Sequence, residues 1–147
     1  MKKCLSIYAL TGLLVGMLTS CEVEISGNGN LDGFWHLEQV DTLSTGGVAD
    51  LSGQLMFWSF QHHLMAVVDR NNKNPEMVLR FLHDSNRLVV SEPYISDRET
   101  GDIKVTDAGQ LAPYGITALA DTFTIEKLKR STFILKNKTL RLTLKKF

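Results

Sequence analysis

The sequence predicts an all-β protein: a small antiparallel up-and-down barrel of about eight short strands, with one short helix or helical turn. Three observations support this fold class. From position 34 onward, short apolar runs are separated by residues typical of turns. Where a period can be read in these runs it is two, as in a strand with one face in water. A single short segment has the pattern of a helix.

The composition indicates one globular domain. The chain has 147 residues, of which 44% are hydrophobic, and 16 Lys and Arg residues balance 16 Asp and Glu residues. This apolar fraction is too high for a disordered chain. A net charge of zero argues against a dedicated nucleic-acid-binding protein, so no nucleic-acid partner is expected.

The first twenty residues have the features of a signal peptide. Lys2 and Lys3 precede an apolar run, 5–17, that is too short and too rich in glycine for a membrane span of about 20 residues. The next residues, Leu18-Thr19-Ser20-Cys21, resemble the lipobox of bacterial lipoproteins. This resemblance implies cleavage after residue 20 and acylation of Cys21 with chains such as palmitate. The protein would then be anchored in the cell envelope, in the outer membrane. An ordinary signal peptide followed by an incidental cysteine is the alternative.

The two cysteines and the acidic segment after them define the start of the domain. Cys4 leaves with the signal peptide and Cys21 takes the lipid, so the mature domain has no thiol for a disulfide, a metal or nucleophilic catalysis. Residues 21–33 mix acidic residues with Gly and Asn and are predicted to form a flexible tether. The barrel domain is expected to cover 34–147.

Eight strands are expected, at 34–43, 54–60, 63–69, 76–83, 87–92, 121–128, 131–136 and 139–146. The segments between them are rich in Gly, Asn, Asp, Ser and Pro, and several have the length of a hairpin turn. In the last strand, three leucines alternate with polar residues, which predicts one buried face. Residues 55–60 and 64–68 are apolar on both faces, so both faces of these two strands should be covered.

One helical turn is expected before the sixth strand. Thr106 is the expected N-cap of a turn over 107–111, which Pro113 and Gly115 would end. Residues 106–120 also contain apolar side chains. They are expected to cover the outward face of strand 54–60 or, alternatively, to cap the barrel mouth.

Closure of the barrel would pair the first strand with the last. Glu38 and Asp41 would then face Arg141 and Lys145 across the seam. All sixteen acidic residues lie at or before Glu126, whereas residues 127–147 contain eight basic residues and no acidic residue. A solvated outer face of two strands is the favoured interpretation of this basic segment. A surface for anionic lipid or another polyanion is the alternative.

The start of the first strand, Gly33-Phe34-Trp35, resembles the Gly-x-Trp signature of lipocalins. The resemblance implies that Trp35 plugs the closed end of the barrel beneath a cation from the last strand, Arg141 or Lys145.

Residues 31–147 are also similar to small lipocalin-like lipoproteins of unknown function from Gram-negative gut anaerobes. The segments that carry this similarity are 33–37, 55–68, 111–116, 123–128 and 145–147. The chain departs from true lipocalins in lacking their Thr-Asp-x-x-Tyr segment and disulfide.

The sequence contains no recognisable catalytic or metal-binding motif, so neither an enzyme nor a cofactor is expected. It has no Gly-rich phosphate loop, no Gly-x-Ser-x-Gly elbow and no His-Glu-x-x-His helix. His62 and His63 would point to opposite faces of a strand and could not share a metal ion easily. The acidic residues between Asp97 and Asp107 lack the spacing of a calcium loop.

Two non-enzymatic functions are therefore expected in preference to an enzymatic one. The first is a lipid-anchored barrel that binds a small apolar or amphipathic ligand, with lining candidates Phe57, Trp58, Phe60 and Phe81 and with Trp58 inside the barrel or at its mouth. The alternative is a non-enzymatic accessory subunit of an envelope complex with a packed barrel. An open lumen would favour the ligand, and a lumen filled by side chains would favour a protein partner.

Overall fold

The structure is a computed structural model that describes residues 26–147. The expected signal peptide and the expected lipidation site, Cys21, lie outside the described residues. Among the described residues, no helix is long and apolar enough to cross a membrane.

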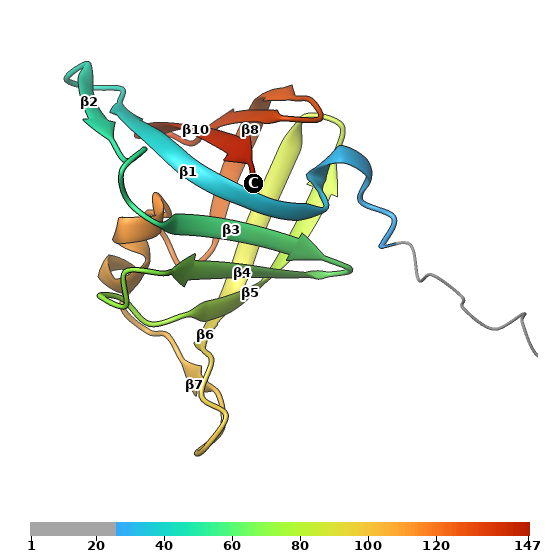
Figure 1. Ribbon diagram of the computed structural model, residues 1–147, viewed down its shortest axis with the longest axis vertical. Helices are drawn as coiled ribbons and strands as arrows, with labels where there is room; N and C mark the ends of the chain where they lie inside the picture. The colour runs from blue at the N-terminus through green and yellow to red at the C-terminus, as the bar shows by residue number, and fades with distance from the viewer. Residues whose placement is uncertain (1–25) are drawn as a thin grey trace, which may run out of the picture.

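Eight antiparallel strands form a closed up-and-down barrel, as predicted (Figure 1). Each strand pairs with the next one along the barrel, and β10 pairs with β1 to close it. The barrel strands are β1 (Gly33–Thr42), β3 (Met56–Gln61), β4 (Leu64–Asp69), β5 (Met77–Asp84), β6 (Arg87–Ile95), β8 (Asp121–Leu128), β9 (Thr132–Lys136) and β10 (Leu140–Lys146). All eight correspond to the strands expected from the sequence.

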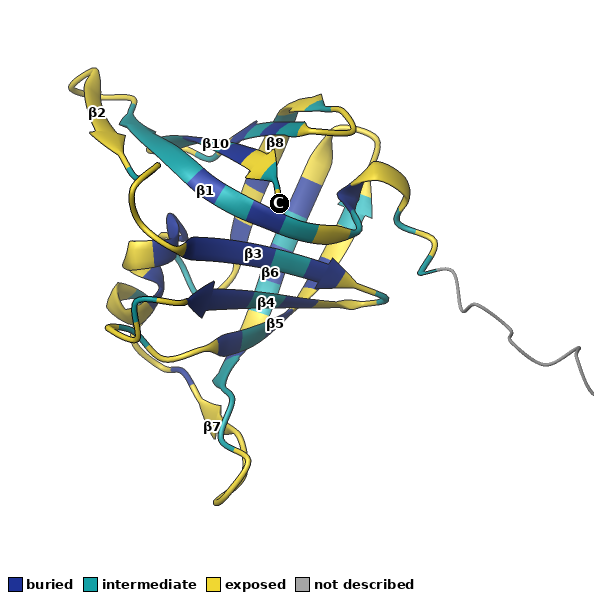
Figure 2. Cartoon of the chain, viewed as in Figure 1, coloured by how far each residue is buried: buried dark blue, intermediate teal, exposed yellow. Residues whose placement is uncertain are grey.

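Two further strands lie outside the barrel and were not predicted. β2 (Gly47–Asp50) extends a hairpin from the second half of β1, and β7 (Ile103–Lys104) pairs with the end of β6. Every residue of both strands is exposed (Figure 2). Because neither strand buries a face, neither has the alternation of apolar and polar residues that identifies a strand in a sequence.

The barrel interior is the hydrophobic core. Inward-facing residues alternate with outward-facing ones, as in β10, where Leu142 and Leu144 are buried between more exposed neighbours. β3 is buried along most of its length, because its outward side is also covered at Phe57. This agrees with the expectation for β3, whereas β4, which was also expected to be covered on both faces, leaves Leu64 exposed.

The segment just before the barrel is packed rather than extended over the surface. Residues Gly29–Leu31 form a short 3-10 helix, η1, in which Leu31 is fully buried. The Asp32 carboxylate accepts a hydrogen bond from the Ser26 hydroxyl at 2.6 Å and another from the Asn28 amide group at 2.8 Å. The described part of the expected tether, 26–33, therefore belongs to the closed end of the barrel.

The expected helical turn is present as a 3-10 helix, η2 (Ala108–Tyr114). Its N-cap is Asp107, whose side chain accepts a hydrogen bond from the Gly109 amide, and not Thr106 as expected. Pro113 lies inside the helix, and the helix ends at Gly115, where a φ of 79° suits glycine. A Cβ at this position would lie 2.7 Å from the Leu142 side chain, so the position also needs the absence of a side chain.

Candidate binding site: the barrel interior and its two ends

Aromatic side chains fill the barrel interior. Trp58 is fully buried and its ring lies 5.8 Å from the ring of Phe123. Phe60 lies between Phe81, at 5.2 Å, and Phe133, at 6.2 Å. Such edge-to-face contacts are typical of a packed core. Three of the four lining candidates, Trp58, Phe60 and Phe81, therefore point inward, and there they contact one another and the core.

Phe57 does not line the interior, in contrast to the expectation. It alternates with Trp58 along β3 and points outward, yet only 3% of it is exposed. The ring of Phe34 stacks on it at 4.7 Å and that of Phe147 meets it at 5.2 Å. Residues 106–120 are the cover that the sequence predicts for this face, but Phe34, in β1, and Phe147 cover it instead.

Residues 106–120 instead cap the barrel mouth. The Trp58 indole N–H donates a hydrogen bond to the backbone carbonyl of Tyr114 at 3.0 Å, which joins the cap to β3. The Tyr114 hydroxyl in turn donates to the carbonyl of Pro75, at 2.8 Å, in the loop between β4 and β5. Leu111, Tyr114 and Ile116 are fully buried. Residues 106–120 thus close the hydrophobic core at the mouth of the barrel.

The cap tyrosine has a perturbed pKa. Burial, together with the nearby carboxylates of Asp69 and Glu76, raises the pKa of Tyr114 well above its ordinary value of 10.0. The unfolded chain therefore releases this proton at a lower pH than the folded barrel. The stability that the neutral hydroxyl contributes is fully present below pH 10.0 and is lost as the pH rises toward the folded pKa.

We expect Tyr114→Phe to cost about 1 kcal/mol at neutral pH, because the carbonyl of Pro75 loses its hydrogen bond. Above pH 10.0 the difference between variant and wild type should shrink, since only the wild type has this tyrosine proton to lose. Urea denaturation at a series of pH values measures both free energies of unfolding. A constant difference across the series would contradict the assigned burial of the hydroxyl.

The closed end of the barrel is built around Trp35. This residue is fully buried, and its indole N–H donates a hydrogen bond to the carbonyl of Leu31 at 2.8 Å. The Lys146 ammonium lies 4.2 Å from the centre of its ring and donates to the backbone carbonyls of Asn30 and Asp32. Burial lowers the pKa of Lys146, and the attraction of the Asp32 carboxylate offsets only part of this effect.

The cation over Trp35 is therefore Lys146, and not Arg141 or Lys145 as expected. Directly paired residues on neighbouring strands point to the same side of the sheet, and the residue that pairs with Trp35 is Lys146. Arg141 lies on the outer face, 2.6 Å from the Glu126 carboxylate and 3.5 Å from that of Asp41. The expected pairing of Asp41 with Arg141 across the seam is thus present.

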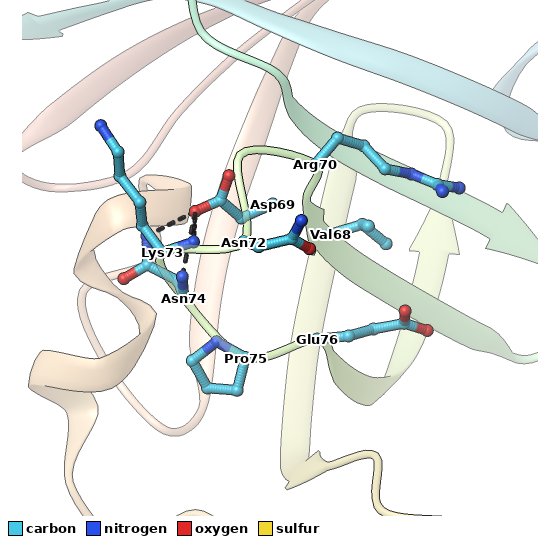
Figure 3. A pocket seen from close by; sticks show the side chains of 8 residues that line it. All are labelled: Val68, Asp69, Arg70, Asn72, Lys73, Asn74, Pro75 and Glu76. Atoms are coloured by element: carbon cyan, nitrogen blue, oxygen red, sulfur yellow. Dashed lines mark hydrogen bonds between the residues drawn. The ribbon is translucent and has the colours of Figure 1, made fainter.

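A polar surface cavity of about 410 Å³ lies beside the loop between β4 and β5 (Figure 3). Its buried carboxylate, Asp69, accepts hydrogen bonds from the Asn71 backbone amide at 2.8 Å and from the Asn74 side-chain amide at 2.9 Å. Burial alone would raise the pKa of Asp69, but these and further hydrogen bonds from the loop lower it below its ordinary value. The carboxylate is thus occupied in holding the loop.

Two smaller cavities, of about 290 and 250 Å³, lie on the outer face of the strands from β3 to β6, and both include Leu64 and Val78. Within residues 26–147, no three His, Cys, Asp or Glu side chains are close enough together to hold a metal ion. The inward-facing side chains form one buried apolar cluster, and the cavities described here lie on the outside of the barrel.

Sequence reasoning did not foresee the roles of two residues that organise the ends of the barrel. Lys146 is the second of two adjacent lysines, and its position opposite Trp35 is set by the register of β10 against β1. Tyr114 lies in residues 106–120. The sequence leaves two placements open for this segment, over the outward face of strand 54–60 or over the barrel mouth. For Lys146 alone, alternation along β10 was a usable signal, because Leu142 and Leu144 point inward and Lys146 continues their series.

Comparisons with known proteins agree with this architecture. A crystal structure of a lipocalin-like protein from Bacteroides uniformis is similar to this chain, with a TM-score of 0.61 and 18% identity over 81% of this chain and 100% of that one. An uncharacterized protein from Bacteroides eggerthii gives a TM-score of 0.56 and 17% identity over 80% of this chain and 99% of that one. No curated protein matches the chain. At these identities the likeness shows the fold alone.

The sequence itself identifies the family. The family model described as a lipocalin-like domain matches residues 16–147, which is most of the chain. The expected resemblance to lipocalin-like proteins is thereby confirmed. With its closed eight-stranded barrel, a tryptophan at one end and a helical cap at the other, the chain belongs to the lipocalin-like domain family.

Proposed function

We propose that this protein is a lipid-anchored protein of the bacterial envelope, held in the outer membrane through Cys21, and that its barrel is a non-enzymatic binding module. Its partner is another envelope protein, bound on the outer surface of the barrel. A small apolar or amphipathic ligand inside the barrel is the second candidate.

The filled interior is the observation that supports a protein partner. The positions that would line a ligand cavity are occupied by Trp58, Phe60 and Phe81, which pack against other buried rings. Sites for small molecules are concave and largely formed in advance, with volumes of about 300–1,000 Å³. The cavities described above lie outside the barrel instead, where a protein surface can reach them.

The anchor is supported by the sequence before the barrel. Cys21 follows Leu18-Thr19-Ser20, which has the pattern of a lipobox, and precedes the first described residue, Ser26, by five positions. More than one acyl chain is needed for stable attachment to a bilayer, and lipoprotein processing supplies them at the cysteine. The anchor would keep the barrel within a few residues of the membrane.

Replacement of the cysteine tests the anchor. We expect Cys21→Ala to move the protein from the membrane fraction to the soluble fraction and to remove the acyl chains from its intact mass. Cys4→Ala is the matched control, since Cys4 lies inside the expected signal peptide and should be dispensable. Retention of Cys21→Ala in the membrane fraction would contradict lipid anchoring at this residue.

The two binding candidates are separated by native mass spectrometry of the protein extracted from its own envelope. A second protein chain in the complex supports the accessory function, whereas a co-purified small molecule supports ligand binding. The second candidate is favoured by one observation: the mouth is closed by a short helix that hydrogen bonds to Trp58. Displacement of this cap would open an apolar interior.

A titration tests the second candidate directly. If fatty acids or apolar fluorophores enter the barrel, the emission of Trp58 should shift or be quenched, because the indole loses its hydrogen bond to Tyr114. Trp58→Phe is the control for the signal, since Trp35 lies at the other end. An unchanged spectrum with every amphiphile up to its solubility would remove this candidate.

A further inference from the structure

The closed end of the barrel joins several segments that are distant in the sequence. It consists of η1, the β3–β4 turn, the β8–β9 turn and the end of β10. The backbone amide of His62, in the β3–β4 turn, donates a hydrogen bond to the Ser26 hydroxyl at 2.7 Å. The Lys146 amide donates to the carbonyl of Ser131, in the β8–β9 turn, at 3.0 Å. The Lys146 ammonium also donates to the carbonyl of Asn30, in η1, and to that of Asp32, directly after η1, so these segments form one surface.

This surface carries exposed positive charge. Lys127, Lys129, Arg130 and Lys145 are all exposed, at the end of β8, in the turn after it and near the end of β10. Among the residues that the structure describes, no carboxylate forms an ion pair with any of these four side chains.

Three carboxylates in the adjoining segments already have partners of their own. Asp32 accepts hydrogen bonds from Ser26 and Asn28. Asp84 pairs with Arg87 at 3.1 Å. Glu126 binds both Lys136 and Arg141. The four cations therefore remain available to an external anion.

The chain enters the barrel at this same surface (Figure 1). The first described residue, Ser26, is hydrogen bonded to the β3–β4 turn. Cys21 precedes it by five residues, and five residues span at most about 17 Å when fully extended. A lipid anchor on Cys21 would thus hold the closed end, and not the capped mouth, next to the bilayer.

We propose that the closed end of the barrel docks on the anionic headgroups of the membrane that holds the anchor, through Lys127, Lys129, Arg130 and Lys145. This proposal rests on the proposed acylation of Cys21. Basic side chains close to an anionic surface each strengthen binding about fivefold. Glu22 and Glu24 lie next to the anchor and oppose this attraction, but the four cations outnumber them.

Docking at the closed end fixes which surfaces a partner can reach. The η2 cap, the loop between β4 and β5 and the β7 hairpin lie at the other end of the barrel (Figure 1). They would face away from the bilayer. The proposed partner would then bind at the mouth or on the side of the barrel.

Lysine labelling on vesicles tests the orientation. The acylated full-length protein is placed in neutral phosphatidylcholine vesicles or in vesicles that contain about 30% phosphatidylglycerol. Amine-reactive labelling is then followed residue by residue by mass spectrometry. We expect labelling of Lys127, Lys129 and Lys145 to slow about fivefold in the anionic vesicles. It should recover in about 1 M salt, where screening shortens the Debye length to about 3 Å.

Three other lysines serve as internal controls. Lys73, Lys104 and Lys138 are exposed and lie in loops or in a strand toward the mouth. Their labelling should not depend on lipid charge. Equal protection of both sets would overturn the proposed orientation, and equal labelling of the closed-end lysines in both vesicles would overturn the docking itself.

A variant separates the charges from the anchor. Replacing the four closed-end cations with Gln should abolish the protection of the β8–β9 turn from hydrogen exchange on anionic vesicles, whereas Gln at Lys73, Lys104 and Lys138 should preserve it. Intact mass reports acylation in every sample. An acylated protein without charge-dependent protection contradicts this proposal alone, and a protein without acyl chains contradicts the anchor.

Discussion

Replacing Trp35 with alanine is expected to lower the free energy of unfolding by about 3–5 kcal/mol, the usual cost of truncating a buried aromatic side chain. Trp35 is fully buried, packs 5.4 Å from the ring of Phe133 and donates a hydrogen bond to the carbonyl of Leu31. Its loss would leave a cavity at the closed end and an unsatisfied carbonyl. Urea denaturation followed by the fluorescence of Trp58 measures the effect.

Two further variants show which part of this effect belongs to the plug. Leu82→Ala changes a residue that is 75% exposed and should cost less than about 0.5 kcal/mol. Lys146→Met keeps the aliphatic stem over the indole but removes the charge, so it should cost about 1 kcal/mol through the lost cation–π contact. A loss below about 1 kcal/mol for Trp35→Ala would contradict a structural plug at this end.

Trp58→Ala is expected to cost a similar 3–5 kcal/mol and to create an apolar cavity in the barrel. The ring of Trp58 lies between Phe60 and Phe123, and its N–H holds the cap at the carbonyl of Tyr114. Engineered apolar cavities of this kind stay dry and accept small apolar molecules. The variant should therefore bind benzene-sized ligands that the wild-type barrel excludes, and added ligand should restore part of the lost stability.

Thermal unfolding with and without benzene gives both results. Trp58→Phe is the matched control, because it keeps most of the volume while it removes the hydrogen bond to the cap. We expect it to lose less stability and to bind no benzene. Benzene binding by the wild-type barrel would show that its interior opens in solution, and would favour the small-molecule candidate over the protein partner.

The packed interior limits what membership of the lipocalin-like family implies about a ligand inside this barrel. A small barrel of about eight strands either packs its interior with side chains or holds one small ligand. In this chain the inward positions are large and the mouth is closed by η2. The shared architecture therefore does not by itself distinguish a small-molecule ligand from a protein partner. The inward-facing side chains of this chain are what distinguishes them.

The sequence by itself determined the eight barrel strands and the two faces of most of them, but not β2 or β7. Alternation in β10 placed Leu142 and Leu144 inside, and turn residues marked the hairpins of the barrel. These signals are local: side chains alternate across a strand with a period of two, and a tight turn needs residues with suitable backbone freedom. Trp35 was singled out because Gly33-Phe34-Trp35 resembles the Gly-x-Trp signature of lipocalins, and the structure places it at the closed end.

Only the tertiary structure decided which distant residues meet. A bulge between Leu37 and Gln39 shifts the register of β1 against β10 by one residue. With this register the residue opposite Trp35 is Lys146, whereas Lys145 pairs with His36 on the outer face. Alternation along β10 places Lys146 on the inward face with Leu142 and Leu144. Which residue of β1 lies opposite Lys146 depends on the register, which local pattern does not contain.

The same limit applies to the cover of Phe57 and to the cap. Residues 106–120 have apolar side chains that must be buried, but nothing in their order shows whether they lie over the outer face of β3 or over the mouth. The hydrogen bonds from Trp58 to the carbonyl of Tyr114 and from Tyr114 to that of Pro75 decide for the mouth. Hydrophobic burial has no direction, so apolar sequence determines that a segment packs, and the geometry of the closed barrel determines where it packs.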